Sequence, residues 1–250
     1  MRFEDWNMNR MVYVVGNEQE QHFQFLFSIF SALGYPFAEK CFHMSYGMIS
    51  LPDGKMKSRE GNVVDADNLA TDMHDAAKQV LMSRYPDLQG EALEDRAEMI
   101  AMAAIKFFIL KYDAKKDFVF DRNQSLSFEG ESGPYMQYTV ARCTSILEKQ
   151  AATNTDGNFE LLVEPEERIL LVLLQDFPQI IQRAANSYQP YLVARYLLEL
   201  ARSFNSYYQQ HKVITDDIAL TQARCALLAG IRQVLENGLR LLGIETMQQM

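Results

Sequence analysis

The feature that most constrains the fold is an almost unbroken helical pattern over the second half of the chain. From Pro134 onward, apolar residues recur every three or four positions, and short polar stretches separate the long segments. Pro134, Pro165 and Pro190 stand where helices commonly begin, and we expect Pro178 to mark a further start. Asp216-Asp217 can cap the last long segment. The pattern predicts a bundle of about five packed helices.

The first part of the chain mixes strand and helix patterns. Met11-Val-Tyr-Val-Val15 predicts a buried strand, and Asn17 followed by Glu20 suggests the capping box of a helix that ends at Gly34. A strand that leads into a helix through a short turn is half of a βαβ unit, and ligands bind at such turns. Gln19 and His22 lie on that first turn, although a solvated Gln19 and a packed His22 are the commoner outcome.

A short basic stretch follows a predicted strand pair that spans Cys41 to Leu51 and is broken near Gly47. Pro52-Asp53-Gly54 predicts a tight turn, after which cations alternate with Met56 and Ser58. The cations are Lys55, Lys57 and Arg59. A loop of this composition suits a polyphosphate, but its glycines lack the spacing of a nucleotide-cradling P-loop. From the residues alone, an exposed basic turn is the commoner explanation.

The middle of the chain predicts two helices. One begins at Asp65 or Asp67 and runs to about Tyr85, and the next spans Glu91 to Lys111. Lys115 to Asp121 predicts a short strand, and a polar connection over residues 124–132 suggests a domain boundary near residue 125.

Composition narrows the classes of function. With 250 residues, 48% of them hydrophobic, the chain can bury a real core, and its longest apolar run, Ile169 to Leu174, is too short to cross a membrane. Three dispersed cysteines favour a reducing, cytoplasmic location, and the four histidines show no metal-ligand spacing, so we expect no metal site. The net charge of −9 argues against non-specific nucleic-acid binding. A local RNA site belongs on the last helices, because residues 183–240 hold seven bases and four acids.

Aromatic and basic side chains are interleaved in the segment from Tyr188 to Tyr208. Judged from residue types alone, this segment is the best candidate for RNA binding. Unpaired RNA bases are bound by stacking on aromatic rings and arginine planes and by hydrogen bonds to amides. Placement of most of these rings in the core of the bundle is the competing interpretation, and for each ring taken singly it is the stronger one.

Several motifs, in the same order along the chain, resemble one family. Residues 11–23, 43–51 and 54–59 together resemble the end of an arginyl-tRNA synthetase catalytic domain, with the basic stretch in place of the Lys-Met-Ser-Lys-Ser signature of class I synthetases. Gly130 to Tyr138 and the terminal Leu241-Leu-Gly-Ile244 resemble the C-terminal half of that family. Lys57 stands where the family usually has a small hydroxyl residue, and the family's His-Ile-Gly-His motif is absent.

The resemblance implies a mostly α fold, in which the remnant of a Rossmann-like catalytic domain precedes an all-α anticodon-binding bundle. The expected divisions are residues 1–64 for the catalytic end, 65–125 for a helical linker and 126–250 for the anticodon-binding domain. The parent protein would ligate arginine to its tRNA through arginyl-adenylate, with ATP and Mg²⁺ as substrate and counter-ion and with no resident metal or organic cofactor. We expect a monomer without membrane contact. The alternative is a stand-alone, non-catalytic tRNA-binding or regulatory fragment.

The resemblance also assigns site residues. The catalytic group would comprise Lys55, Lys57, Ser58 and Arg59. ATP would contact His22, Met48, Lys55 and Met56, and the arginine substrate would contact Gln19. The tRNA would contact Tyr135, Gln137, Tyr188, Arg195, Asn205 and Tyr208, although a structural hinge role for Tyr135 and Gln137 is an equal alternative.

Overall fold

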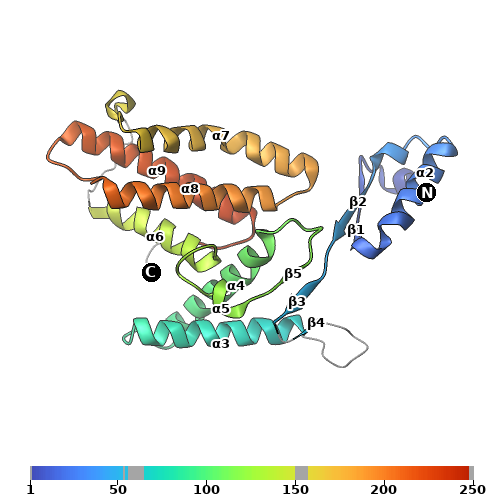
Figure 1. Cartoon of the computed structure of the whole chain (residues 1–250), viewed down its shortest axis with the longest axis horizontal. Helices are drawn as coiled ribbons and strands as arrows, with labels where there is room; N and C mark the ends of the chain where they lie inside the picture. Colours follow the sequence, from blue (N-terminus) through green and yellow to red (C-terminus); the bar gives the residue numbers. More distant parts are fainter. Residues whose placement is uncertain (1, 53, 56–64, 150–156, 248–250) are drawn as a thin grey trace. The chain divides into compact units, whose positions relative to one another are not determined.

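The chain forms two compact units, each with its own secondary structure (Figure 1). The computed structural model describes residues 2–52, 54–55, 65–149 and 157–247. One unit comprises Met1–Met56 with Tyr112–Val119, and the other comprises Lys57–Lys111 with Phe120–Met250. The three-part division expected from the sequence, into residues 1–64, 65–125 and 126–250, is based on motifs and not on which parts of the chain pack together. It therefore stays a prediction.

The first unit is built on a parallel pair of strands. It contains α1 (Arg2–Trp6), β1 (Met11–Gly16), η1 (Asn17–Gln19), α2 (Glu20–Ala32), η2 (Ala38–Lys40) and β2 (Cys41–Tyr46). In the register of β1 and β2, Tyr13 lies opposite His43, so both side chains point to one face. That face packs on α2, because the Phe23 ring lies 5.0 Å from Tyr13 and 4.3 Å from His43.

A second, three-stranded sheet in this unit has the order β4-β3-β5. Its strands are β3 (Ile49–Leu51), β4 (Gly54–Lys55) and β5 (Phe118–Val119), the last supplied by the returning segment. The chain breaks at Gly47 as predicted, but β2 and β3 belong to different sheets and do not pair with each other. The break is held by hydrogen bonds from Gly47 N to Ala114 O (2.7 Å) and from Met48 N to Asp117 Oδ1 (2.7 Å).

Two predictions for this unit are wrong. Asn17 does not cap α2: the chain first makes a turn of 3₁₀ helix, so Gln19 takes the N-cap position and makes no side-chain capping bond. Strand β1 is half-buried rather than buried, and the Val14 side chain is 62% exposed. Strand residues alternate between two faces, and α2 covers the face that carries Tyr13. Val14, the next residue, points to the other face.

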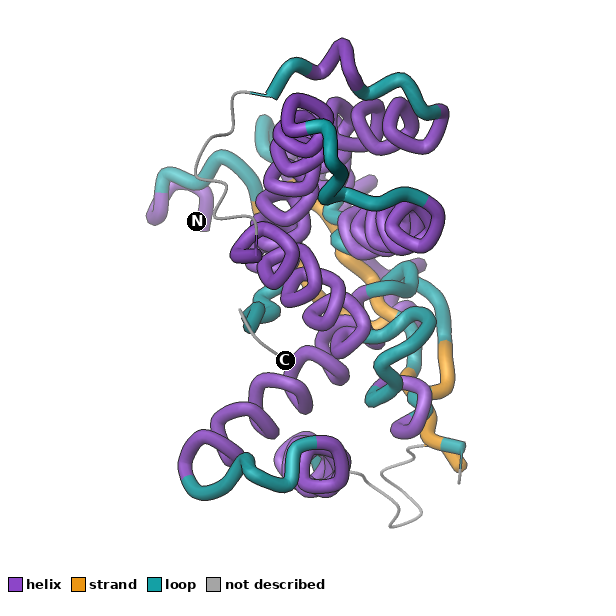
Figure 2. The backbone as a smooth tube through the Cα atoms, turned by 90° about the vertical axis from the view of Figure 1, so that its left-hand side faces the viewer, coloured by secondary structure: helices purple, strands orange, loops and turns teal. Residues whose placement is uncertain are grey.

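The second unit is helical almost throughout (Figures 1 and 2). Helix α3 (Ala66–Arg84) packs on α4 (Glu91–Leu110), and α4 packs on α6 (Gly133–Lys149). Helices α7 (Pro165–Ser187), α8 (Tyr191–Gln210) and α9 (Ile218–Leu241) pack on one another, and α6 packs on α8 and α9. The shorter elements are α5 (Arg122–Ser125) and η3 (Phe159–Leu161). No helix within the described ranges is long and apolar enough to cross a membrane.

Local capping explains where several of these helices begin. The Asp65 side chain accepts a hydrogen bond from Asp67 N at the start of α3, and Asp217 accepts bonds from two backbone N–H groups at the start of α9, as predicted. Pro178, however, lies inside α7 rather than at a helix start. The proline removes one backbone hydrogen bond, but Leu174, Phe177 and Ile181 on either side of it pack against the core, which favours a continuous helix.

A buried polar network joins three helices of this unit. Glu167 of α7 is fully buried, and its Oε1 accepts hydrogen bonds from Arg224 Nε of α9 (2.7 Å) and from Tyr207 Oη of α8 (3.0 Å). Arg224 Nη1 also donates to Lys212 O at 2.8 Å. Burial and the nearby Glu167 charge raise the pKa of Tyr207, so its hydroxyl remains a donor. Each buried polar atom named here therefore has a partner.

Helices α4 and α6 approach so closely that only glycine fits at position 133. A Cβ atom there would lie 2.0 Å from Ala103 O and 2.3 Å from Ala103 C, both backbone atoms. We therefore expect Gly133→Ala to destabilise the unit by about 1–3 kcal/mol, because the helix backbones must move apart. Urea unfolding followed by circular dichroism measures this. In the control Gly230→Ala, the added Cβ would meet the flexible end of Leu174 at 3.2 Å, and the cost should be clearly smaller. Equal costs would contradict the steric argument.

Candidate nucleic-acid interface

The helical unit contains a groove of about 1060 Å³ bounded by α3, α6, α8 and the segment Asn123–Glu129. Aromatic and polar side chains line it. From α6 come Tyr135, Tyr138 and Arg142, and from α8 come Asn205 and Gln209. The lining also includes Arg84, Tyr85 and Phe128. Because all of these residues belong to the second compact unit, the groove is a feature of that unit alone.

Spacing along two helices brings these side chains together. Tyr135, Tyr138 and Arg142 are separated by three and four positions, which places them on one face of α6. Asn205 and Gln209 are separated by four positions on α8, which packs on α6. The C-terminal end of α3 supplies Arg84, whose Cζ lies 4.2 Å from the centre of the Phe128 ring.

Arg142 is held at the centre of this arrangement. Its Cζ lies 4.7 Å from the centre of the Tyr138 ring and 5.6 Å from that of Tyr208, and its Nη1 donates to Asn205 Oδ1 at 2.5 Å. Asn205 Nδ2 in turn donates to Tyr135 Oη (2.8 Å) and to Thr139 Oγ1 (3.1 Å). A guanidinium fixed in this way keeps donors on its other nitrogen atoms for a ligand.

The predicted tRNA-binding residues fall into different positions. Tyr135 and Asn205 line the groove, and Tyr208, 39% exposed, lies beside it next to Arg142. Arg195 is exposed on α8, and Tyr188 ends α7 in a left-handed conformation with φ of 55°. These two are not groove residues. Three other rings of the aromatic segment, those of Tyr196, Phe204 and Tyr207, are buried in the helix bundle, as the competing core interpretation expects.

Gln137 is fully buried, and its Nε2 donates to Met99 O (3.2 Å) and to Glu245 O (2.8 Å). These bonds tie α6 to α4 and to the segment after α9, which favours the structural alternative stated for this residue. Tyr138 and Arg142 were not among the predicted contacts. Their spacing with Tyr135 on one predicted helix face was the signal that could have identified them.

Two of the predicted substrate residues, Gln19 and Met48, follow directly after the carboxyl ends of β1 and β2 along the chain. Gly16 and Tyr46 are register partners at those ends, and the chain continues from them into Gln19 and into Met48. Gln19 and His22 are exposed, and Met48 is 47% exposed. Carboxyl ends of parallel strands are where ligands bind in α/β folds.

The basic stretch is described only at its beginning. Lys55 lies in β4, opposite Ser50 of β3 in an antiparallel pair. Met56, Lys57, Ser58 and Arg59 lie outside the described residues, so their assignments stay predictions.

Comparison with known proteins divides the chain between two family models. Residues 1–122 match the catalytic domain of class I tRNA synthetases of the arginine type, and residues 136–250 match the DALR anticodon binding domain. Together these matches define the end of a class I synthetase catalytic domain followed by an anticodon-binding domain. The fold class predicted from the sequence is confirmed.

Individual relatives specify the family further. The chain is 36% identical to an arginine–tRNA ligase of Parabacteroides distasonis and 40% identical to one of Borrelia duttonii, and in both cases the match covers 100% of this chain. An arginyl-tRNA synthetase structure from Thermus thermophilus matches 97% of the chain with a TM-score of 0.86 and 32% identity. The chain belongs to the arginyl-tRNA synthetase family. It spans 43% of the length of those two curated relatives and 41% of the Thermus chain.

Proposed function

We propose that this chain is the C-terminal part of an arginine–tRNA ligase and that its helical unit binds the anticodon arm of arginine tRNA. The observation that carries the proposal is the groove around Arg142, which lies in a unit that includes the region matched by the anticodon-binding model. The groove combines aromatic rings, a fixed guanidinium and amide groups, which are the chemical groups that bind unstacked RNA bases.

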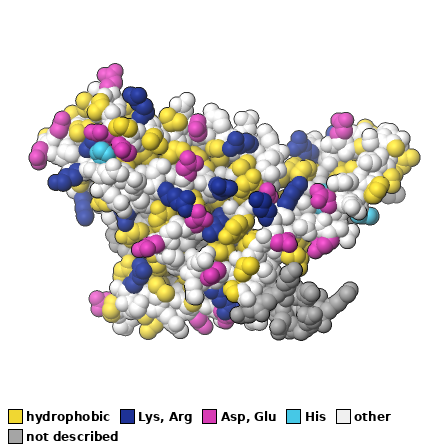
Figure 3. Space-filling model, viewed as in Figure 1, with side chains coloured by type: hydrophobic (Ala, Val, Ile, Leu, Met, Phe, Trp, Pro, Cys, Tyr) yellow, Lys and Arg dark blue, Asp and Glu magenta, His cyan; other side chains and the backbone are white. Residues whose placement is uncertain are grey.

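The surface charge also suits a selective site. In Figure 3, basic and acidic side chains are interspersed over the visible face of the helical unit, and no continuous basic surface covers it. With a net charge of −9, general attraction to phosphates is weak. Selectivity must therefore come from contacts to bases within the groove, supported by a few phosphate contacts such as the one we assign to exposed Arg195.

Residues between Gln19 and Arg59 supply part of the ligation site in this proposal. Gln19 contacts the arginine substrate, and Lys55 with Arg59 counters the charge of the ATP phosphates, with Mg²⁺ as counter-ion. His22, Met48 and Met56 complete the ATP contacts. The proposal places the protein in the cytoplasm as a monomer. The competing function is a non-catalytic tRNA-binding fragment, which shares the groove but needs none of these residues.

This chain by itself is expected to form no arginyl-adenylate. Its sequence contains no pair of histidines with the spacing of the family's ATP-binding motif, and one basic loop cannot replace a nucleotide site. Arginine-dependent exchange of pyrophosphate into ATP should equal the no-enzyme blank. Exchange above the blank that disappears in Lys55→Ala would contradict this expectation.

The two proposed substrate contacts should act differently in a protein that carries both this chain and the histidine motif. Lys55→Ala should lower kcat by about a hundredfold or more, because a cation near the departing pyrophosphate acts mainly in the transition state. Gln19→Ala should raise KM for arginine and leave KM for ATP nearly unchanged. Steady-state pyrophosphate exchange at varied arginine and ATP concentrations separates the two. Wild-type kinetics in both variants would favour the non-catalytic alternative.

A further inference from the structure

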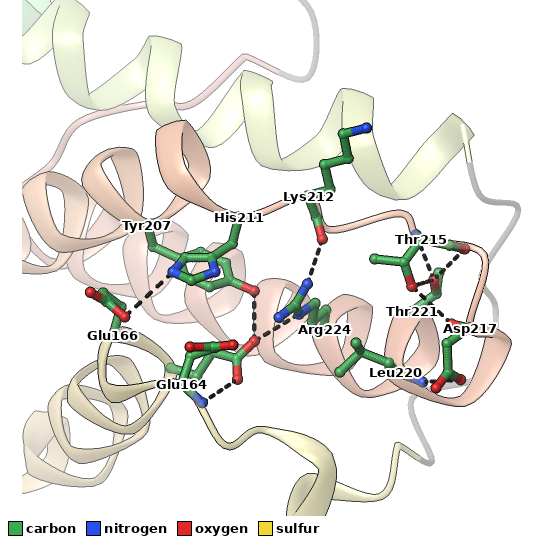
Figure 4. Close-up of polar contacts among 11 residues, drawn as sticks. Glu164, Glu166, Tyr207, His211, Lys212, Thr215, Asp217, Leu220, Thr221 and Arg224 are labelled. Atoms are coloured by element: carbon green, nitrogen blue, oxygen red, sulfur yellow. Dashed lines mark hydrogen bonds and ion pairs between the residues drawn. The ribbon is translucent and has the colours of Figure 1, made fainter.

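Three potential metal ligands meet where α7 begins and α8 ends (Figure 4). Glu164 precedes α7, Glu166 lies in its first turn, and His211 directly follows α8. One ligand atom from each of the three side chains lies within 4.8 Å of the other two. All three side chains are half-buried, so they are ordered by packing and still reachable from solvent.

The distance between two of these donors fits a shared ion better than a direct hydrogen bond. His211 Nε2 lies 3.4 Å from Glu166 Oε2, whereas N–H···O bonds in proteins are about 2.7–3.2 Å long. Zinc bonds to nitrogen and oxygen of roughly 2.1 Å at tetrahedral angles place two ligand atoms about 3.4 Å apart. The third donor, from Glu164, lies within 4.8 Å of the other two.

The surrounding network fixes the histidine ring. Tyr207 stacks on His211 with the ring centres 5.0 Å apart and an angle of 21° between the planes. The Tyr207 hydroxyl bonds to Glu167, and Glu167 Oε2 accepts a bond from Glu164 N at 3.1 Å. Groups behind the ligands in metal sites commonly hold the ligands in this manner.

Charge in the cluster also favours a cation. Arg224 is bonded to Glu167, and the Lys212 side chain extends away from the three donors in Figure 4. The Glu164 side chain accepts one backbone N–H bond as a helix cap, which leaves its carboxylate further acceptor positions. The positive end of α7 opposes a cation here and the negative end of α8 favours one, so the two helix dipoles largely offset each other.

We propose that Glu164, Glu166 and His211 bind one divalent metal ion of the zinc type, with water at a fourth position. One imidazole and two carboxylates are ligands that suit zinc and its neighbours in the first transition row. The ion joins the beginning of α7 to the end of α8. It is distinct from the Mg²⁺ that accompanies ATP, and it does not depend on the proposed ligase activity.

The test is isothermal titration of the tag-free 250-residue chain with zinc sulfate after removal of metals with a chelator. All samples carry Cys41→Ser, because Cys41 is half-exposed and thiolates also bind zinc. One zinc ion per chain should bind, and His211→Gln and Glu166→Gln should each weaken binding about tenfold or more. Magnesium sulfate should produce no saturable heat at the same concentrations.

A second histidine provides the matched control. His74 Nδ1 lies 3.5 Å from Asp75 and His74 Nε2 lies 3.4 Å from Glu94, so its carboxylates face opposite ring nitrogens and cannot share one ion with it. His74→Gln should leave zinc binding unchanged. Circular dichroism checks the folding of every variant, and if His211→Gln unfolds, the more exposed Glu166→Gln decides. Absence of saturable zinc binding, or equal affinity in folded Glu166→Gln and in the parent chain, would overturn the proposal.

Discussion

Replacement of Arg224 by methionine is expected to lower the free energy of unfolding of the helical unit by about 3–5 kcal/mol. Arg224 is the charged partner of Glu167, whose side chain is fully buried, and the Arg224 side chain is itself only 8% exposed. Without Arg224 the Glu167 carboxylate remains buried with the Tyr207 hydroxyl and backbone groups as its neighbours, and its charge is no longer compensated. Urea unfolding followed by far-ultraviolet circular dichroism measures the loss.

An exposed ion pair provides the control for this prediction. Arg202 lies 2.6 Å from Glu131, and the two side chains are 53% and 48% exposed. Arg202→Met should cost at most about 1 kcal/mol, because water screens the pair. Combining Arg224→Met with Glu167→Leu should recover part of the stability lost in Arg224→Met alone, since no unpaired charge then remains buried. Similar losses in Arg224→Met and Arg202→Met would contradict the assigned role of the buried pair.

Arg142→Met should weaken binding to an arginine anticodon stem-loop by about 1–3 kcal/mol. The change removes the guanidinium that lies between the rings of Tyr138 and Tyr208 and releases Asn205 from its hydrogen bond. Methionine keeps much of the side-chain volume, so the helix packing should persist. Fluorescence anisotropy with a labelled stem-loop measures the change in affinity.

Arg168→Met is the matched control for that experiment, because Arg168 is exposed on α7 and is not a groove residue. It removes the same charge and should change the affinity only slightly. Two further variants separate the types of contact: Arg195→Ala should flatten the dependence of affinity on salt, whereas Tyr208→Ala should lose about 1–3 kcal/mol at one base. An equal loss of affinity in Arg142→Met and Arg168→Met would indicate a general effect of charge. It would contradict the claim that the groove binds the RNA.

Local sequence patterns predicted much of the fold, because hydrogen bonds between residues close together in the chain determine where several helices begin. Asp65 and Asp217 cap α3 and α9 through bonds to backbone groups two or three residues away. The failures have other causes. Asn17 was displaced from its predicted capping role by a turn of 3₁₀ helix, and Pro178 lies within α7 because neighbouring apolar residues pack on the core.

The groove shows which part of a site a sequence can reveal. Tyr135, Tyr138 and Arg142 share a helix face that is visible from their spacing, and the family resemblance drew attention to Tyr135. The hydrogen bonds of Tyr135 and Arg142 with Asn205, and the contribution of residues 123–129 to the groove, join segments far apart in the chain. Such contacts depend on how α6 and α8 pack, which local periodicity does not specify.

The most direct test of the central claim compares two labelled anticodon stem-loops in fluorescence anisotropy with the whole chain. One carries the arginine anticodon, and the other differs only at the central anticodon base. Because base contacts discriminate whereas phosphate contacts do not, we predict tighter binding of the arginine stem-loop, with affinity that falls as salt rises and a preference that decreases in Arg142→Met. Equal affinity for the two stem-loops, or no binding of either at low salt, would contradict the claim that the helical unit recognises the anticodon arm.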